Sequence, residues 1–205
     1  MTVQAVRKRC WGEVDALMGA YHDREWGVPL HDDKKIFEFL ILEGMQAGLS
    51  WQLILNKREN FRRAFHGFDP RRVARYGERD LKRLLADPGI IRNRLKLWSA
   101  VNNAQRFLEV QKEFGSFDKY IWAFVGGQPI RSGLLSFKDM PARTTLSDSI
   151  SRDLKARGFK FVGSTVIYSH LQATGMVNDH LVWCFRYKEI GRLPVTGERS
   201  RRKAR

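Results

Sequence analysis

The stretch of sequence that decides the fold is FLILEGMQAGLSWQLILN, residues 39–56. It carries a single formal charge, Glu43, although charged residues make up 29% of the chain. A segment this apolar is expected to be buried, and a buried carboxylate is costly unless another group pairs with it. Glu43 therefore either binds backbone amides at a helix end or faces a pocket whose ligand supplies the partner. Composition alone favours the first interpretation, because structural pairing also keeps charges inside proteins.

The residues that follow Glu43 shift the balance toward a pocket. Gly44 and Gly48 lower helix propensity and allow a ligand or another backbone to approach closely. Ser50 is typical of an N-cap, which predicts a second helix with Trp51 in its first turn. A lone acid, a bend that contains glycine and a large aromatic ring can together hold a small flat ligand.

The chain as a whole predicts an all-α fold with one compact, bundle-like domain. Its 205 residues, 43% hydrophobic and 12% aromatic, are enough for a single substantial core. Strand alternation is scarce, whereas capping, proline and glycine signals divide the sequence into helical segments. Helices are expected at residues 33–43, 50–65, 78–86, 90–110, 116–125, 147–157, 164–174 and 178–185, with a short one from residue 70. Residues 10–31 are expected to be irregular, and residues 126–146 to form the longest loop.

The folded domain is expected to span residues 9–190. Residues 1–8 are predicted to be a flexible N-terminus and residues 191–205 a disordered basic tail. The start of the sequence, MTVQAVRKRCW, lacks the apolar segment of a signal peptide, and no segment is apolar enough to span a bilayer. We therefore expect a soluble, cytoplasmic protein in which Cys10 and Cys184 stay reduced.

The net charge of the chain is strongly positive. There are 37 basic residues against 22 acidic ones, which gives +15 at pH 7. Residues 191–205 contribute six Arg or Lys and one Glu, so most of the excess belongs to the rest of the chain. A basic folded body indicates a polyanionic partner, most often nucleic acid. A basic domain that touches no nucleic acid is the alternative.

Two thiols and two imidazoles near opposite ends of the chain form a candidate zinc site. His180 and Cys184 are four residues apart on the last expected helix and would share one face. Cys10 and His22 are the comparable pair near the N-terminus. Together they form the Cys₂His₂ set of a closed, structural zinc site. The spacing matches no standard zinc finger, so buried cysteines and satisfied histidines are an equal alternative.

A helical hairpin is expected at DLKRLLADPGIIRNRLKLW, residues 80–98. A Pro-Gly turn that leads into a helix N-terminus points free backbone N–H groups at one spot, which suits a phosphate. Arg92, Arg94 and Lys96 add positive charge to the second arm. Gly89 forms the turn that leads into this arm. The residues of the arm that are available for the core are Ile90, Ile91, Leu95 and Trp98. A plain structural turn is the alternative, since such turns are common between helices.

Five blocks of sequence, in order, resemble one family. They are AYHDREWGVP (20–29), LEGMQAGLSW (42–51), DPGIIRNRLK (87–96), RGFKFVGST (157–165) and GMVNDHLVWC (175–184). The chain resembles the type I 3-methyladenine DNA glycosylases over about residues 9–187. Five ordered blocks are far more specific than any single motif described above.

The resemblance implies a helix-hairpin-helix glycosylase fold with a zinc clasp. Its ligands would be Cys10, His22, His180 and Cys184. A monomer would bind alkylated double-stranded DNA, flip out 3-methyladenine and hydrolyse its N-glycosidic bond. The products would be an abasic site and free 3-methyladenine, with no lyase step.

The resemblance also implies roles for individual residues. Glu43 would be the catalytic residue, a pocket carboxylate that accepts hydrogen bonds from the damaged base. The base-binding side chains would be Tyr21, Trp26, Glu43 and Trp51, and the DNA contacts Gly48, Leu49, Gly89, Ile90, Arg92 and Arg94. In that family a loop like that of Gly48 and Leu49 enters the gap left by the flipped base.

Two departures from the family pattern concern the pocket. The family usually has one residue between the cysteine and the next tryptophan, whereas here Trp11 directly follows Cys10, so the sequence does not decide whether Trp11 lines the pocket. Met18 stands where a tyrosine is often found. The competing hypothesis is a zinc-stabilised DNA-binding protein without catalysis. That hypothesis keeps the basic surface, the hairpin and the clasp, but it gives Glu43 no purpose.

Overall fold

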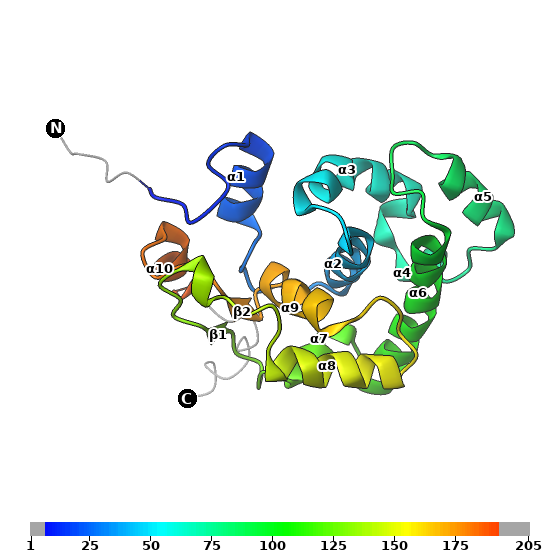
Figure 1. Cartoon of the computed structure of the whole chain (residues 1–205). Coiled ribbons are helices and arrows are strands. Elements are labelled where there is room, and N and C mark those ends of the chain that lie inside the picture. Colours follow the sequence, from blue (N-terminus) through cyan, green and yellow to red (C-terminus); the bar gives the residue numbers. More distant parts are fainter. Residues whose placement is uncertain (1–6, 193–205) are drawn as a thin grey trace, which may run out of the picture.

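The helix that carries Glu43 lies in the middle of the molecule. In the computed structural model, α2 (Asp33–Gln46) begins at the N-cap Asp32, and its residues 36–45 are all buried. It is buried along this length because α3, α6, α7 and α9 pack around it, as Figure 1 shows. The helix continues three residues beyond the predicted end at residue 43. Gly44 lies inside it, where a Cβ atom would meet Phe161 at 3.5 Å.

The structure describes residues 7–192, and this part of the chain is mostly helical and forms one domain, as predicted. The other helices are α1 (Ala16–Arg24), α3 (Trp51–Ala64), α4 (Pro70–Val73), α5 (Glu78–Ala86), α6 (Arg94–Phe114), α7 (Phe117–Ala123), α8 (Thr145–Ala156), α9 (Ser164–Ala173) and α10 (Phe185–Ile190). Short 3₁₀ turns span His66–Phe68 and Phe137–Asp139, and β1 (Ile130–Arg131) pairs with β2 (Val177–Asn178). Most of the expected N-terminus (1–8) and tail (191–205) falls outside the described residues. No described helix is long and apolar enough to cross a membrane.

The expectation that residues 10–31 are irregular is wrong. They contain α1, which begins where the Asp15 carboxylate accepts a hydrogen bond from the backbone N–H of Met18, at 2.7 Å. Gly19, a residue type with low helix propensity, is buried within α1. A Cβ atom there would lie 2.8 Å from the carbonyl oxygen of Gly12, so glycine is needed for close packing.

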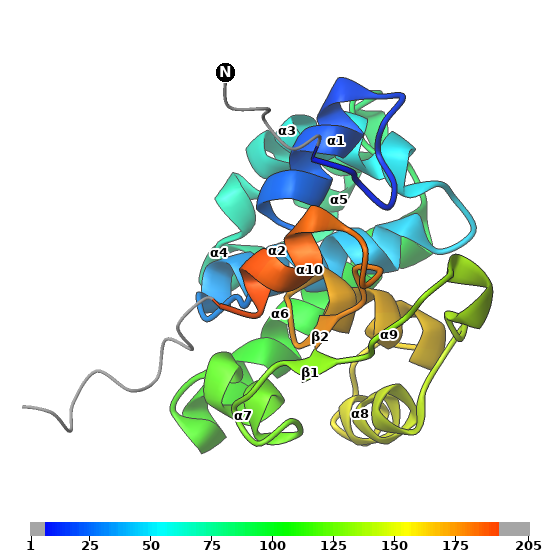
Figure 2. The ribbon, with the colours of Figure 1, turned by 90° about the vertical axis from the view of Figure 1, so that its left-hand side faces the viewer.

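The expected helix over residues 178–185 is also wrong. Asn178 does not cap a helix, because its backbone belongs to β2, which pairs in parallel with β1 (Figure 2). The side-chain oxygen of Asn178 instead accepts a hydrogen bond from the backbone N–H of His180. The last helix, α10, begins only at residue 185, with Cys184 as its N-cap. His180 and Cys184 therefore do not share a helical face.

The hairpin between α5 and α6 differs from the expected one at its turn. Helix α5 has the predicted bounds, but α6 begins at residue 94 instead of 90, with Asn93 as its N-cap. The Asp87 carboxylate accepts a hydrogen bond from the Gly89 backbone N–H at 2.7 Å, and the Asp87 carbonyl accepts one from Ile90. Two turn amides that were expected to be free are therefore already paired.

In the first turn of α6, the side chains that are buried and those that are exposed differ from the prediction. Leu95 and Trp98, which were expected in the core, are 72% and 38% exposed. Lys96, which was expected to face a phosphate, is buried. Its ammonium donates hydrogen bonds to the carbonyl oxygens of Met45 (2.8 Å) and Ala47 (2.6 Å). Lys96 thus satisfies orphan carbonyls at the end of α2 and ties α6 to the Glu43 helix.

Gly175 provides a test of how tightly α9 packs against the N-terminal segment. Its φ is +70°, and an added Cβ atom would lie 2.2 Å from the Val28 carbonyl carbon. We expect Gly175→Ala to lower the free energy of unfolding by about 3 kcal/mol or more. Gly127 is the control, since it has φ +74° and no atom within 4 Å of an added Cβ. Gly127→Ala is expected to cost about 1 kcal/mol, from backbone strain alone. Equal losses in urea unfolding would contradict the packing argument.

Candidate functional site

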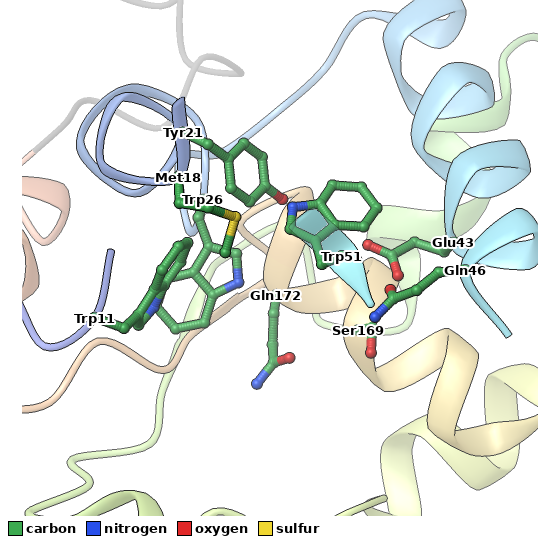
Figure 3. A pocket seen from close by; sticks show the side chains of 9 residues that line it. All are labelled: Trp11, Met18, Tyr21, Trp26, Glu43, Gln46, Trp51, Ser169 and Gln172. Atoms are coloured by element: carbon green, nitrogen blue, oxygen red, sulfur yellow. The ribbon is translucent and has the colours of Figure 1, made fainter. Parts of the chain in front are cut away.

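A cavity of about 240 Å³ opens between α1, α2, α3 and α9 (Figure 3). Four of the residues that line it were predicted base-binding residues, namely Tyr21, Trp26, Glu43 and Trp51. The structure therefore brings together side chains that are up to 30 positions apart in the sequence. The remaining lining residues are Trp11, Met18, Gln46, Ser169 and Gln172.

Glu43 is an unpaired carboxyl group in the wall of this cavity. Its side chain lies in the last turns of α2 and is only 4% exposed. Among residues 7–192, no group donates a hydrogen bond to its carboxylate, and no cation forms an ion pair with it. Burial in this environment raises the pKa of Glu43 to about 8. The carboxyl group is thus available to a ligand that enters the cavity.

Aromatic rings form the opposite side of the cavity. The Tyr21 and Trp51 ring centroids are 5.3 Å apart, with the planes inclined at 46°. Trp51 is also stacked near Phe39, and its indole Nε1 is buried without a hydrogen-bond partner in the described part of the chain. These rings offer flat, polarisable faces near Glu43.

The open questions about Trp11 and Met18 have a structural answer. Both side chains line the cavity. The Trp11 ring packs edge-on against Trp26, with centroids 5.1 Å apart. Trp11 therefore faces the pocket even though it directly follows Cys10.

Sequence reasoning missed three polar lining residues. Gln46 lies three positions after Glu43 on α2, so helical spacing could have placed it beside that acid. Ser169 and Gln172 have the same spacing on α9. Nothing in the sequence indicates that α9 packs against α2, so these two could not have been found.

The loop after α2 borders a second cavity of about 150 Å³. This cavity shares Glu43, Gln46 and Ser169 with the first, so the two adjoin. Leu49 lines it and is 39% exposed. Gly48 has φ +76° with no atom within 4 Å of an added Cβ, so this loop is open to an approaching partner.

Three of the four predicted metal ligands meet beside the pocket. The donor atoms of Cys10, His22 and Cys184 all lie within 4.8 Å of one another. His22 Nε2 is 3.3 Å from Cys10 Sγ and 3.4 Å from Cys184 Sγ. The ring of His180 is centred 4.6 Å from the His22 ring, and both of its nitrogens are buried without a partner in the described part of the chain.

The surroundings of this cluster suit a metal ion. Burial, followed by the nearby His22, lowers the pKa of His180 to about 3, so its imidazole is neutral, which is the form that binds metals. His22 Nδ1 lies 2.8 Å from the Asp23 carboxylate, which Arg9 grips with two hydrogen bonds. A carboxylate on the far nitrogen is the usual orienting partner of a metal-bound histidine. Binding to such an ion would give one of these two His180 nitrogens a partner.

The predicted DNA contacts of the hairpin lie away from the cavity. The hairpin is at the right-hand edge of the molecule in Figure 1. Arg92 and Arg94 are exposed, and Arg94 lies 3.4 Å from Glu78. Ile90 is buried, and the amide of Gly89 is paired with Asp87. Of the four predicted contacts in the hairpin, the two arginines are the ones that present charge to a partner.

Comparisons with known proteins agree on one family. The family model for methyladenine glycosylases matches residues 11–187. The chain is 49% identical over 181 residues to DNA-3-methyladenine glycosylase 1 of Escherichia coli (strain K12), covering 88% of this chain and 97% of that protein. A crystal structure of 3-methyladenine DNA glycosylase I superimposes with a TM-score of 0.84 at 49% identity, covering 87% of this chain and 98% of that one.

A second solved structure, which addresses 3-methyladenine recognition, comes from Staphylococcus aureus 3-methyladenine DNA glycosylase I. It superimposes with a TM-score of 0.82 at 39% identity, covering 84% of this chain and 92% of that one. The matches extend over nearly the whole described domain and include the segments that carry the cavity. This chain therefore belongs to the methyladenine glycosylase family.

Proposed function

We propose that this protein is a DNA repair glycosylase that excises 3-methyladenine from alkylated DNA. Relatives that are 42–49% identical over most of the chain carry that name. The observation that carries the proposal is Glu43, an acid in a cavity lined by aromatic rings that has no partner in the described part of the chain. A non-catalytic DNA-binding protein would have no use for this arrangement.

The damaged base has to leave the duplex before it can reach such a cavity. Flipping a nucleotide costs a few kcal/mol, which an apolar side chain inserted into the vacated stack helps to offset. Leu49 is the exposed apolar side chain of the loop beside Glu43. We assign the insertion to Leu49 and Gly48, because that loop has open space around it.

Charge distinguishes 3-methyladenine from normal adenine. The N3-methylated base is cationic while it is attached to its sugar, whereas adenine is neutral. Each aromatic face that contacts a cation contributes on the order of 0.5–2 kcal/mol, and Tyr21 and Trp51 supply such faces. Glu43 supplies the opposite charge. Because the leaving group is already activated by its own charge, the reaction needs little acid–base assistance.

The cavity favours hydrolysis without a lyase step. A lyase reaction needs an amine that attacks the sugar carbon and forms a Schiff base. None of the side chains that line the cavity is a lysine. Lys96, the buried lysine near the end of α2, has its ammonium held by two carbonyl oxygens.

The pKa of Glu43 links base binding to a proton. Because burial raises this pKa to about 8, the carboxyl group is largely protonated in the free protein at pH 7. A cationic base stabilises the ionised form, so its binding releases the proton. Falling pH therefore opposes binding.

We predict an acidic limb in the pH profile of kcat/KM for release of 3-methyladenine from methylated DNA. We expect kcat/KM to rise about tenfold per pH unit up to about pH 8 and then level off, because only ionised Glu43 pairs with the cation. Glu43→Gln should lose this limb and about 100-fold in kcat/KM, while still binding DNA. Ser169→Ala, a control in the same cavity, should keep the limb. Release of 3-methyladenine by Glu43→Gln at the wild-type rate would contradict the role of Glu43, and no release by the folded wild-type protein would contradict the function.

We also propose that Cys10, His22, His180 and Cys184 hold a structural zinc ion. The proposal is supported by the converging donor atoms and by the unpartnered nitrogens of His180. Such a site has no open position for chemistry. Its effect would be to join the segment before α1 to the segment before α10, which already meet where Phe185 N–H donates to the Lys8 carbonyl.

Metal analysis tests the zinc proposal. Wild-type protein is expected to contain one zinc per chain, and Cys184→Ala to lose it together with several kcal/mol of stability, because metal binding adds to folding free energy. Asp23→Asn keeps all four ligands, so it should keep zinc but bind it about 10–100-fold more weakly. A wild-type protein that contains no zinc, and whose Tm is unchanged by a chelator, would rule the site out.

We propose that Arg92 and Arg94 bind the phosphate backbone of DNA. Both are exposed at the hairpin, and the protein carries a net charge of +15. Phosphate contacts fix position without reading sequence and make affinity depend on salt. The buried Ile90 acts only through the shape of the turn, and Gly89 fits there because a Cβ atom would lie 2.9 Å from Asn60.

Salt dependence tests the hairpin. Changing both Arg92 and Arg94 to Ala should weaken DNA binding equally for all sequences and reduce the salt slope by about 1 for each lost contact. Arg152, an exposed arginine on α8, is the control, and Arg152→Ala should leave the slope unchanged. If the double variant keeps the wild-type slope, DNA lies elsewhere on the surface.

A further inference from the structure

The short parallel sheet places a buried aspartate beside the cavity. Asp179 follows β2 and is fully buried. Ser132 follows β1, and its backbone N–H donates to the Asn178 carbonyl at 3.4 Å, which brings it next to Asp179. The Asp179 carboxylate accepts hydrogen bonds from the hydroxyls of Ser132 and Tyr168 and from the side-chain amide of Gln172.

This network fixes which way the Gln172 amide points. The NH₂ of Gln172 faces Asp179 and donates to its carboxylate at 2.7 Å. Each carboxylate oxygen also accepts a hydrogen bond from a hydroxyl, one from Ser132 and the other from Tyr168. The Gln172 nitrogen lies 3.4 Å from the Met140 sulfur. Turning the amide over would place its oxygen against the carboxylate. The carbonyl oxygen is therefore held on the other side, and Figure 3 shows it on the side of Ser169 in the wall of the cavity.

We propose that Gln172, locked by Asp179, is a specificity-determining residue that selects 3-methyladenine over 3-methylguanine. The inference rests on the proposed function, because it concerns the base held in this cavity. Adenine carries an amino group at C6, whose hydrogens can be donated to the Gln172 oxygen and to Glu43. Guanine carries an oxygen at C6, which has no hydrogen to donate and would face the fixed oxygen of Gln172. Its amino group lies at C2, beside the methylated nitrogen.

The two other uncharged polar side chains that α2 and α9 contribute to the cavity are less able to discriminate. Gln46 has no side-chain hydrogen-bond partner among residues 7–192, so its amide can turn to present either its nitrogen or its oxygen. The Ser169 hydroxyl donates to the Thr165 carbonyl at 3.3 Å, and a hydroxyl can rotate between donating and accepting. Gln172 differs because reversing its amide would break a buried hydrogen bond to a carboxylate.

The test compares two bases in one protein. Calorimetry gives the affinities for free 3-methyladenine and free 3-methylguanine, and methylated DNA gives the kcat/KM values for their release. In the wild type both ratios should favour 3-methyladenine. We expect Gln172→Met, which keeps the length but removes the acceptor, to lower both ratios about tenfold. A ratio within one variant is insensitive to the folded fraction, so a merely structural role would not move it.

Two further variants test whether Asp179 fixes the orientation of the Gln172 amide. Asp179→Asn allows the Gln172 amide to turn over, so it should lower the ratios in the same direction. Tyr168→Phe removes a different donor to Asp179 and leaves the Gln172 bond in place, so its ratios should stay at the wild-type value. A wild-type ratio in Gln172→Met, or no binding preference in the wild type, would overturn the inference. Failure of the wild type to release 3-methyladenine would instead count against the proposed function, since the free-base affinities do not depend on catalysis.

Discussion

In the folded protein the Glu43 carboxyl group is buried, and no group among residues 7–192 pairs with it. The group would ionise readily in the unfolded chain but holds its proton in the folded one, where its pKa is raised from 4.5 to about 8. Stability therefore falls as pH rises between these two values, by on the order of 5 kcal/mol in total. A protein that keeps such a group inside sacrifices stability for a site in which a cation is the missing partner.

The two sides of the cavity are held by different devices. Helix α2 is fixed by core packing and by Lys96, whose ammonium caps its final carbonyls. The aromatic side follows α1, and Arg58 links it to the core by pairing with both Glu25 and Glu38. The cluster of Cys10, His22 and Cys184 lies behind that side, so a metal ion there would hold the rings in place without touching the ligand.

Local signals in the sequence were sufficient for much of the fold. Asp32, Ser50 and Ser116 all act as N-caps, and the bounds of α5 agree with the prediction. These features depend on residues within one turn of the helix end. The same reasoning failed for α1, because Gly19 serves close packing against Gly12, which is a tertiary requirement. No helix forms over residues 178–185, because Asn178 pairs with strand β1, which lies some 50 residues earlier in the sequence.

The site residues that the family resemblance implies could be predicted from the sequence. Those that reach the cavity only through tertiary packing could not. The sequence identified Glu43 through its isolation in an apolar segment, and the structure places it in the cavity with Tyr21, Trp26 and Trp51. Helix α9 contributes Gln172 through a contact that no local pattern indicates. The reasoning that joined His180 to Cys184 was wrong in geometry, although both side chains still lie beside His22.

The most direct test of this account is an NMR titration of the Glu43 side-chain carboxyl carbon in the free protein. We expect a pKa near 8 for Glu43, since burial without a partner disfavours the charged form. A bound cationic purine should lower this pKa. A pKa near 4.5 in the free protein would show that another group already pairs with Glu43, and would contradict the claim that the cavity awaits a cation.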